Sequence, residues 1–68
     1  MKENFFSKNL KNLRIETKIS QDVLAKKLNV SIKSISHWET GYSEPSISQL
    51  LQLADLFEIS LDELLCKN

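Results

Sequence analysis

The sequence predicts an all-α fold of five short helices. Apolar residues recur at helical spacing in five segments, and serines stand where most of these segments begin. No segment of useful length alternates between apolar and polar residues as a strand would. With 68 residues the chain has no material for a second core, so we expect one compact domain over residues 1–68.

The first helix is predicted over about residues 4–17. Phe6, Leu10 and Leu13 recur there at intervals of three or four residues, with polar residues between them. This spacing places the apolar side chains on one side of a helix. We therefore expect an amphipathic helix that contributes one face to the core.

The second helix, over about residues 21–28, and the third, over about 31–40, are separated by a very short break. Ser20 and Ser31 are N-cap candidates for the two helices. Asn29 can adopt the left-handed conformation that ends a helix. Two helices joined by about three residues have the geometry of a helix-turn-helix.

The third helix is predicted to have two different faces. At about 100° per residue, Ile35 and Trp38 share one side, which we expect to be buried. Ile32 lies at the edge of the other side, near the helix start. That outer side carries polar residues: Lys33, Ser36, His37 and Thr40.

The fourth and fifth helices are predicted over about residues 46–57 and 60–66. Gly41 ends the third helix, and Pro45 closes the loop that follows. Each of the last two helices begins with a capping box, in which a serine is followed three residues later by a residue that caps in return: Ser46 with Gln49, and Ser60 with Glu63.

The charge of the chain is zero overall but divided unequally. Residues 1–40 carry +4, from eight Lys or Arg and four Asp or Glu, whereas residues 41–68 carry −4. Such an asymmetry matters more for a charged partner than the net charge does. The single Cys66 allows no internal disulfide, and neither a signal peptide nor a bilayer-spanning stretch is evident, so we expect a cytoplasmic protein that does not associate with a membrane.

The residue inventory excludes most catalytic and metal chemistry. One histidine and one cysteine cannot supply the ligands of a zinc site, and a single glycine cannot form a phosphate-binding loop. His37 is on a predicted helix surface, and Cys66 is near the end of the chain, so no nucleophile and base pair is apparent. We expect a binding protein rather than an enzyme, with no cofactor and no evident small-molecule ligand.

The stretch SQDVLAKKLNVSIKSISHWETGYSEP carries a resemblance to a known family. It resembles the Cro/phage-repressor type of helix-turn-helix domain, the XRE family, and the match covers about residues 6–66. The matching positions are Ser20, Gln21, Leu24, Ala25, Leu28, Val30, Ser31, Ile35, Ser36, Trp38, Glu39, Gly41 and Pro45. The resemblance implies a compact five-helix, lambda-repressor-like DNA-binding domain in which the second and third helices form the DNA-reading unit.

The resemblance also implies roles for individual residues on double-stranded DNA. Its recognition helix enters the major groove, which makes base-reading candidates of Ile32, Lys33, Ser36 and His37. A second set is expected to position the phosphates: Gln21, Ser31, Thr40 and Tyr42. Five lysines could add diffuse attraction to the backbone: Lys8, Lys11, Lys18, Lys26 and Lys27.

Plainer roles remain open for several of these residues. A lysine on a helix surface is normally a solvated charge, and this remains the alternative for Lys33. Ile32 is equally suited to partial packing against the core. Lys8 and Lys11 fit an ordinary solvated helix face. His37 carries a full charge only when protonated, so we expect DNA binding to tighten as the pH falls from about 8 to about 6 if it contacts phosphate.

Glu39 neighbours the inward face of the third helix, and Trp38 is expected to be a core residue. In the family an arginine of the first helix pairs with this glutamate, and Arg14 is the matching residue here. The resemblance thus implies a buried or half-buried Arg14–Glu39 ion pair that stabilises the fold.

The resemblance further implies a homodimer formed through the fourth and fifth helices. Leu51, Leu61 and Leu65 exceed what a small core needs, although such leucines often belong to the core. The expected function is a small transcriptional repressor that reads a palindromic operator. The alternative is a protein-interaction module, or an antitoxin or controller subunit, with the same fold.

Overall fold

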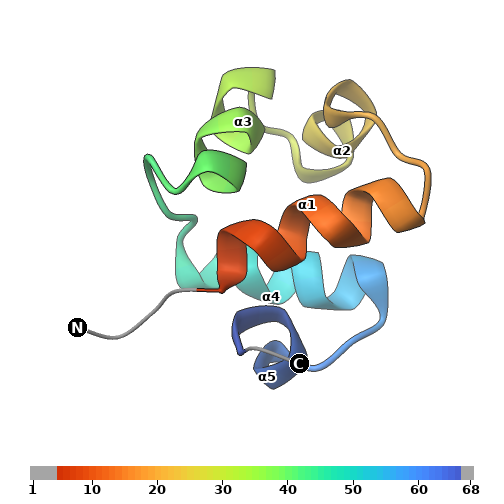
Figure 1. Cartoon of the computed structure of the whole chain (residues 1–68). Helices are drawn as coiled ribbons and strands as arrows, with labels where there is room; N and C mark the ends of the chain where they lie inside the picture. The colour runs from red at the N-terminus through yellow and green to blue at the C-terminus, as the bar shows by residue number, and fades with distance from the viewer. Residues whose placement is uncertain (1–4, 67–68) are drawn as a thin grey trace.

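Five α-helices joined by short loops make up the computed structural model, which describes residues 5–66 (Figure 1). Their bounds are α1 Phe6–Glu16, α2 Gln21–Leu28, α3 Ile32–Thr40, α4 Ile47–Phe57 and α5 Leu61–Leu65. No strand occurs within the described residues. The predicted all-α class with five helices is therefore confirmed.

Three helices begin one residue later than the ranges 31–40, 46–57 and 60–66 predict. Their expected first residues are serines with extended backbone, at ψ values of 157°, 167° and 162°. Each of these serines accepts a hydrogen bond from the backbone N–H three residues later, so it caps its helix from outside. Both predicted capping boxes are formed.

The ends of α1 and α5 also differ from the predicted ranges 4–17 and 60–66. Residue 4 lies outside the described residues, and within them α1 runs from Phe6 to Glu16. The chain turns out of α1 because Lys18 adopts a positive φ of 58°. The last helix ends at Leu65, because Cys66 is extended.

The centre of the core receives one aliphatic side chain from each helix. These five side chains are fully buried: Leu10, Leu24, Ile35, Leu53 and Leu64. Burying one such side chain stabilises the fold by about 1.5–3 kcal/mol relative to leaving it exposed. Because every helix contributes, removing any one helix would open the core.

Helix α1 runs through the middle of the molecule, with α2 and α3 on one side and α5 on the other (Figure 1). It packs against both α3 and α5, while α2 packs against α3 and α4. No helix in residues 5–66 is both long and apolar enough to cross a bilayer.

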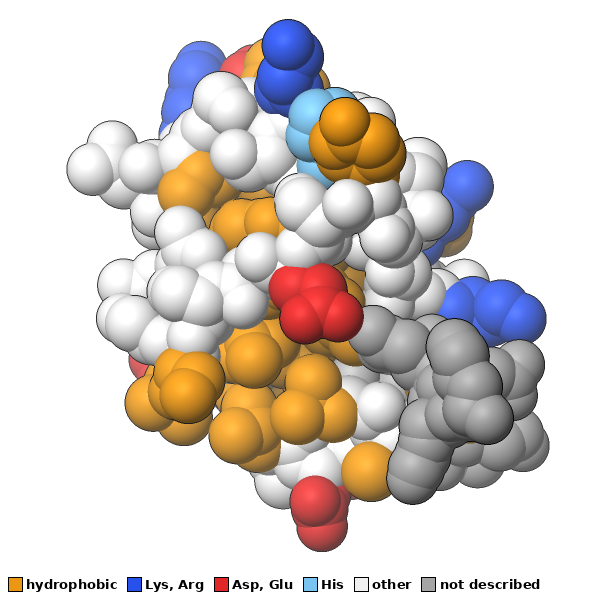
Figure 2. All heavy atoms as spheres, turned by 90° about the vertical axis from the view of Figure 1, so that its left-hand side faces the viewer, with side chains coloured by type: hydrophobic (Ala, Val, Ile, Leu, Met, Phe, Trp, Pro, Cys, Tyr) orange, Lys and Arg blue, Asp and Glu red, His pale blue; other side chains and the backbone are white. Residues whose placement is uncertain are grey.

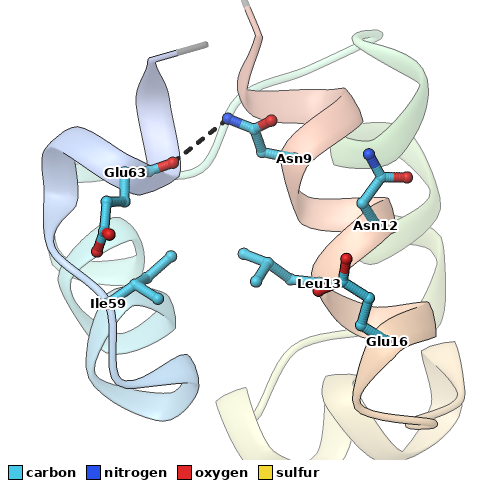
Figure 3. A pocket seen from close by; sticks show the side chains of 6 residues that line it. All are labelled: Asn9, Asn12, Leu13, Glu16, Ile59 and Glu63. Atoms are coloured by element: carbon cyan, nitrogen blue, oxygen red, sulfur yellow. Dashed lines mark hydrogen bonds between the residues drawn. The ribbon is translucent and has the colours of Figure 1, made fainter. Parts of the chain in front are cut away.

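Asn9 of α1 ties the last helix to this frame. Its Nδ2 atom donates to the carbonyl oxygens of Leu64, at 3.0 Å, and Cys66, at 2.9 Å, with a longer contact of 3.4 Å to that of Glu63. Figure 3 shows Asn9 reaching toward Glu63 at one end of a pocket that Leu13 and Ile59 line from opposite sides. A side chain of α1 therefore satisfies carbonyl groups that the short α5 leaves without partners.

Candidate nucleic-acid interface

The turn between α2 and α3 is closed by backbone hydrogen bonds around a left-handed residue. Asn29 has φ 58° and ψ 46°, and its N–H donates to the carbonyl of Lys26. The N–H of Val30 donates to the carbonyl of Ala25 at 3.0 Å. Ser31 then caps α3, so one three-residue turn fixes α3 against α2. Ala25 is 2% exposed, as expected for a small side chain at a close helix crossing.

Helix α3 has one buried face and one open face. Ile35 is fully buried and Trp38 is 4% exposed, so this side belongs to the core, as predicted. On the other side Ile32 is 47% exposed and Lys33 is also exposed, while Ser36 is half-buried. The first two turns of α3 thus present an apolar, a cationic and a hydroxyl group together.

His37 is less open than the helical projection indicated. It is half-buried, and its ring lies against that of Tyr42, with 4.5 Å between the centroids and 48° between the planes. The N–H of Tyr42 also donates to the carbonyl of His37 at 2.9 Å. Tyr42 itself is 79% exposed, so the loop after α3 covers part of His37 and remains open on its own outer side.

Hydroxyl groups at both ends of α3 already have partners within the chain. At the start, Ser31 Oγ accepts from the N–H of Ser34 and lies 3.1 Å from Ser34 Oγ, where either atom can donate. At the end, the hydroxyl of Thr40 donates to the carbonyl of His37 at 3.2 Å. A phosphate oxygen accepts but never donates, so Thr40 would have to turn its proton away from that carbonyl to bind one.

Gln21, the first residue of α2, is joined to α1 and α3 through a buried carboxylate. Arg14 Nε donates to Glu39 Oε2 at 2.6 Å, and Arg14 Nη2 donates to Oε1 at 3.2 Å. Gln21 Nε2 donates to the same Oε1 at 3.1 Å. The side chain of Glu39 is only 4% exposed and that of Arg14 is 15% exposed.

These contacts favour the protonated, positively charged form of Arg14. Its hydrogen bond to Glu39 raises the pKa of Arg14, burial opposes that effect, and the attraction of the carboxylate adds to it. The remaining guanidinium nitrogen Nη1 donates to the carbonyl of Ile19 at 3.0 Å. Among the described residues, no buried side-chain nitrogen or oxygen lacks a hydrogen-bond partner.

The lysines of the first three helices and of the turn after α1 are exposed, and Figure 2 shows blue side chains at the end of the molecule that carries α2 and α3. They are Lys8, Lys11, Lys18, Lys26, Lys27 and Lys33. Lys26 lies 3.6 Å from Asp22 one turn earlier in α2, which offsets part of its charge. The described residues contain no group of three or more His, Cys, Asp or Glu side chains placed to hold a metal ion.

Apolar side chains gather on the opposite half of the molecule, over α4 and α5 (Figure 2). Ile47 is 74% exposed, Leu51 54% and Leu65 37%. An open groove adjoins them, lined by Phe6, Glu44, Pro45, Leu50 and Leu65. Of the three leucines that seemed surplus in the sequence, Leu61 packs against the core instead.

Sequence reasoning missed one hydrogen bond, between Gln21 and Glu39, and one exposed apolar side chain, that of Ile47. The bond from Gln21 to Glu39 joins residues 18 positions apart, and only the packing of α2 on α3 brings them together. Ile47 was overlooked because its place at the start of α4 resembles that of a core residue. A helical projection places it beside Leu50 and the buried Ala54, so only the structure shows that the first turn of α4 leaves it 74% exposed.

The family profile described as helix-turn-helix matches residues 10–64 of the chain. The HTH-type transcriptional activator BcrR of Enterococcus faecalis is 37% identical over 60 residues, which cover 88% of this chain and 29% of BcrR. Two further curated relatives from Bacillus subtilis (strain 168) are matched over about half of their length. The chain therefore spans only part of the curated relatives that it matches.

Two solved structures are similar over most of their length. The P22 c2 repressor, in complex with a synthetic operator, has a TM-score of 0.85 at 33% identity, with 93% of this chain and 96% of that one covered. The restriction-modification controller protein C.AhdI from Aeromonas hydrophila has a TM-score of 0.79 at 29% identity, with 87% and 89% covered. An activator, a repressor and a controller are thus all similar to this chain.

Proposed function

Because the chain belongs to the helix-turn-helix family of the Cro/phage-repressor (XRE) type, we propose that it is a sequence-specific regulator of transcription that binds double-stranded DNA. The observation that carries this proposal is the open face of α3, where Ile32, Lys33 and Ser36 stand exposed or half-buried on a helix fixed from behind by Ile35 and Trp38. A rigid helix with a polar outer face suits the major groove.

Each residue of that face has a base edge that it can recognise. Lys33 can donate to O6 and N7 of guanine, and Ser36 can donate or accept. Ile32 offers an apolar contact to a thymine methyl group. His37, partly covered by Tyr42, is left with a narrower role, as a hydrogen-bonding reader at the end of the contact surface.

The phosphates are assigned to groups around the reading face. Gln21 and Ser31 stand at the starts of α2 and α3, where backbone N–H groups and the helix dipole favour an anion. Thr40 is the last residue of α3 and Tyr42 lies in the loop that follows, where it is open enough for its hydroxyl to donate. Such contacts fix register and orientation on DNA and carry no sequence information of their own.

We further propose that the protein acts as a repressor in the form of a homodimer joined through α4 and α5. The exposed Ile47, Leu51 and Leu65 support this assignment, because they form an apolar surface on the half of the molecule away from α3. Two recognition helices about 34 Å apart would read the half-sites of a palindromic operator one helical turn apart. A DNA target and a single cysteine favour a cytoplasmic location.

Selection from a pool of random DNA duplexes tests the DNA-binding proposal. At low salt we expect enrichment of an inverted repeat whose halves are separated by about ten base pairs. A folded protein that enriches no sequence would refute the proposal. Sedimentation tests the dimer: Leu51→Glu should give monomers, whereas Gln52→Glu, an equal change of charge at an exposed neighbour, should not.

A second candidate function is a protein-interaction module, or an antitoxin or controller subunit that keeps the same fold. The neutral net charge and the apolar surface over α4 and α5 favour it. This alternative fails if Lys33→Ala abolishes DNA binding and biological activity together while leaving every protein contact intact.

A further inference from the structure

Glu39 accepts hydrogen bonds from two different helices at once. Arg14 of α1 donates two, at 2.6 and 3.2 Å, and Gln21 of α2 donates one, at 3.1 Å. With its side chain 4% exposed, Glu39 is held between these two partners and away from solvent. The carboxylate of Glu39 therefore joins α1, α2 and α3 at a buried junction, which consists of Arg14, Gln21 and Glu39.

The chemistry of the junction fixes which way the amide of Gln21 faces. An ionised carboxylate only accepts hydrogen bonds, so the nitrogen of the amide must be the atom that faces Glu39. One N–H of Gln21 is used in this bond, and the second N–H remains for another acceptor. Gln21 is half-buried, so its amide is held at the surface rather than enclosed.

A side chain held in advance binds better than a mobile one. Immobilising a long side chain on binding lowers affinity by about twofold to tenfold, a loss that does not arise when the side chain is already ordered. Arg14 also balances the charge of Glu39, so the carboxylate can orient the amide without repelling a nearby phosphate.

We propose that Arg14 and Glu39 are positioning residues for DNA, which hold the amide of Gln21 so that its free N–H can donate to a phosphate. This inference rests on the proposed DNA-binding function. It assigns to the Arg14–Glu39 pair a role in binding besides its stabilisation of the fold. It also makes the conformation of Gln21 a property of three helices rather than of α2 alone.

A double-mutant cycle on the selected operator tests the proposal. We expect Gln21→Ala to weaken binding by about threefold to tenfold, and Glu39→Gln to weaken it less, because an amide oxygen can still accept one bond. In the Gln21→Ala background, Glu39→Gln should weaken binding no further. Equal effects of Glu39→Gln in both backgrounds would overturn the proposal, because a purely structural role does not depend on Gln21.

Two controls separate positioning from charge and from unfolding. Asp22→Asn removes one negative charge from the same end of α2, so it reports the effect of charge alone. Melting curves establish that each variant is folded at the temperature of the binding assay. If Glu39→Gln is unfolded there, Arg14→Lys replaces it in the cycle, because it keeps the positive charge but loses the two-pronged contact.

The outcomes also distinguish this proposal from the proposed function. If Gln21→Ala leaves operator binding unchanged, the positioning role is wrong and the DNA-binding function stands. If the unaltered protein selects no sequence, both fall. NMR spectra of the free protein add a readout without DNA: the side-chain amide protons of Gln21 should be shifted from those of the exposed Gln52, and Glu39→Gln should reduce that difference.

Discussion

Replacing Arg14 with alanine would leave Glu39 as a buried carboxylate with a single neutral partner. Two of the three hydrogen bonds to Glu39 come from Arg14, and only the bond from Gln21 would remain. The same replacement removes the donor to the carbonyl of Ile19. The loop that leads into α2 would therefore lose a side-chain bond to α1 and keep the backbone bond from the N–H of Ile19 to the carbonyl of Arg14.

The expected loss of stability follows from how deeply the pair is buried. Removing one partner of a buried ion pair costs about 3–5 kcal/mol. Because 15% of the Arg14 side chain is exposed, water can partly replace it, and we expect the lower end, about 3 kcal/mol. A domain of this size has roughly 3–10 kcal/mol of stability in total. The midpoint of thermal unfolding should fall by about 12–24 °C.

Urea unfolding followed by the fluorescence of Trp38 measures this loss, because Trp38 is the only tryptophan and is 4% exposed. Arg14→Ala should lower the midpoint without changing the slope of the transition. Lys11→Ala, at an exposed site of the same helix, serves as the control and should change stability by less than about 0.5 kcal/mol. A loss below about 1 kcal/mol for Arg14→Ala would refute this account, since that is the value of a surface ion pair.

Further outcomes are expected elsewhere in the molecule. Asn9→Ala should destabilise the fold by about 1–2 kcal/mol and speed amide hydrogen exchange in α5 first, because it leaves carbonyl groups unsatisfied. Glu58→Gly should raise the free energy of unfolding, measured by urea titration, by roughly 0.5–1 kcal/mol, because this residue ends α4 in the left-handed conformation at φ 57°. Lys33→Ala should reduce specificity for the selected operator, measured against random competitor DNA.

The sequence contained enough information to predict the helices, because local signals specify where each one starts and stops. Serine N-caps, capping boxes and the left-handed Asn29 and Gly41 all act within one helical turn. The one-residue errors at helix starts arose from counting the cap as helical. The positive φ of Glu58 was not predicted, because a glutamate has no steric preference for the left-handed conformation. This residue lies where the chain turns from α4 into α5, which packs against α1 and α4.

The candidate site was predictable in part. The open face of α3 follows from its periodicity, and the contact between Arg14 and Glu39 follows from the resemblance to a family. The contact between His37 and Tyr42 did not follow, because it depends on how the chain turns back after Gly41. Contacts made by the return of a loop have no periodic signal in the sequence, so the reduced exposure of His37 could be seen only in the fold.

The stability of this protein and its proposed recognition of DNA depend on the same short helix. Of the nine residues of α3, Ile35 and Trp38 belong to the core and Glu39 belongs to the buried junction, while Ile32 and Lys33 are exposed. Because the helix is too short to bend between these groups, a shift of the core must move the exposed side chains with it. Changes in the core that keep the protein folded should therefore still alter which DNA sequence it prefers, whereas changes on the open face should leave stability nearly unaffected.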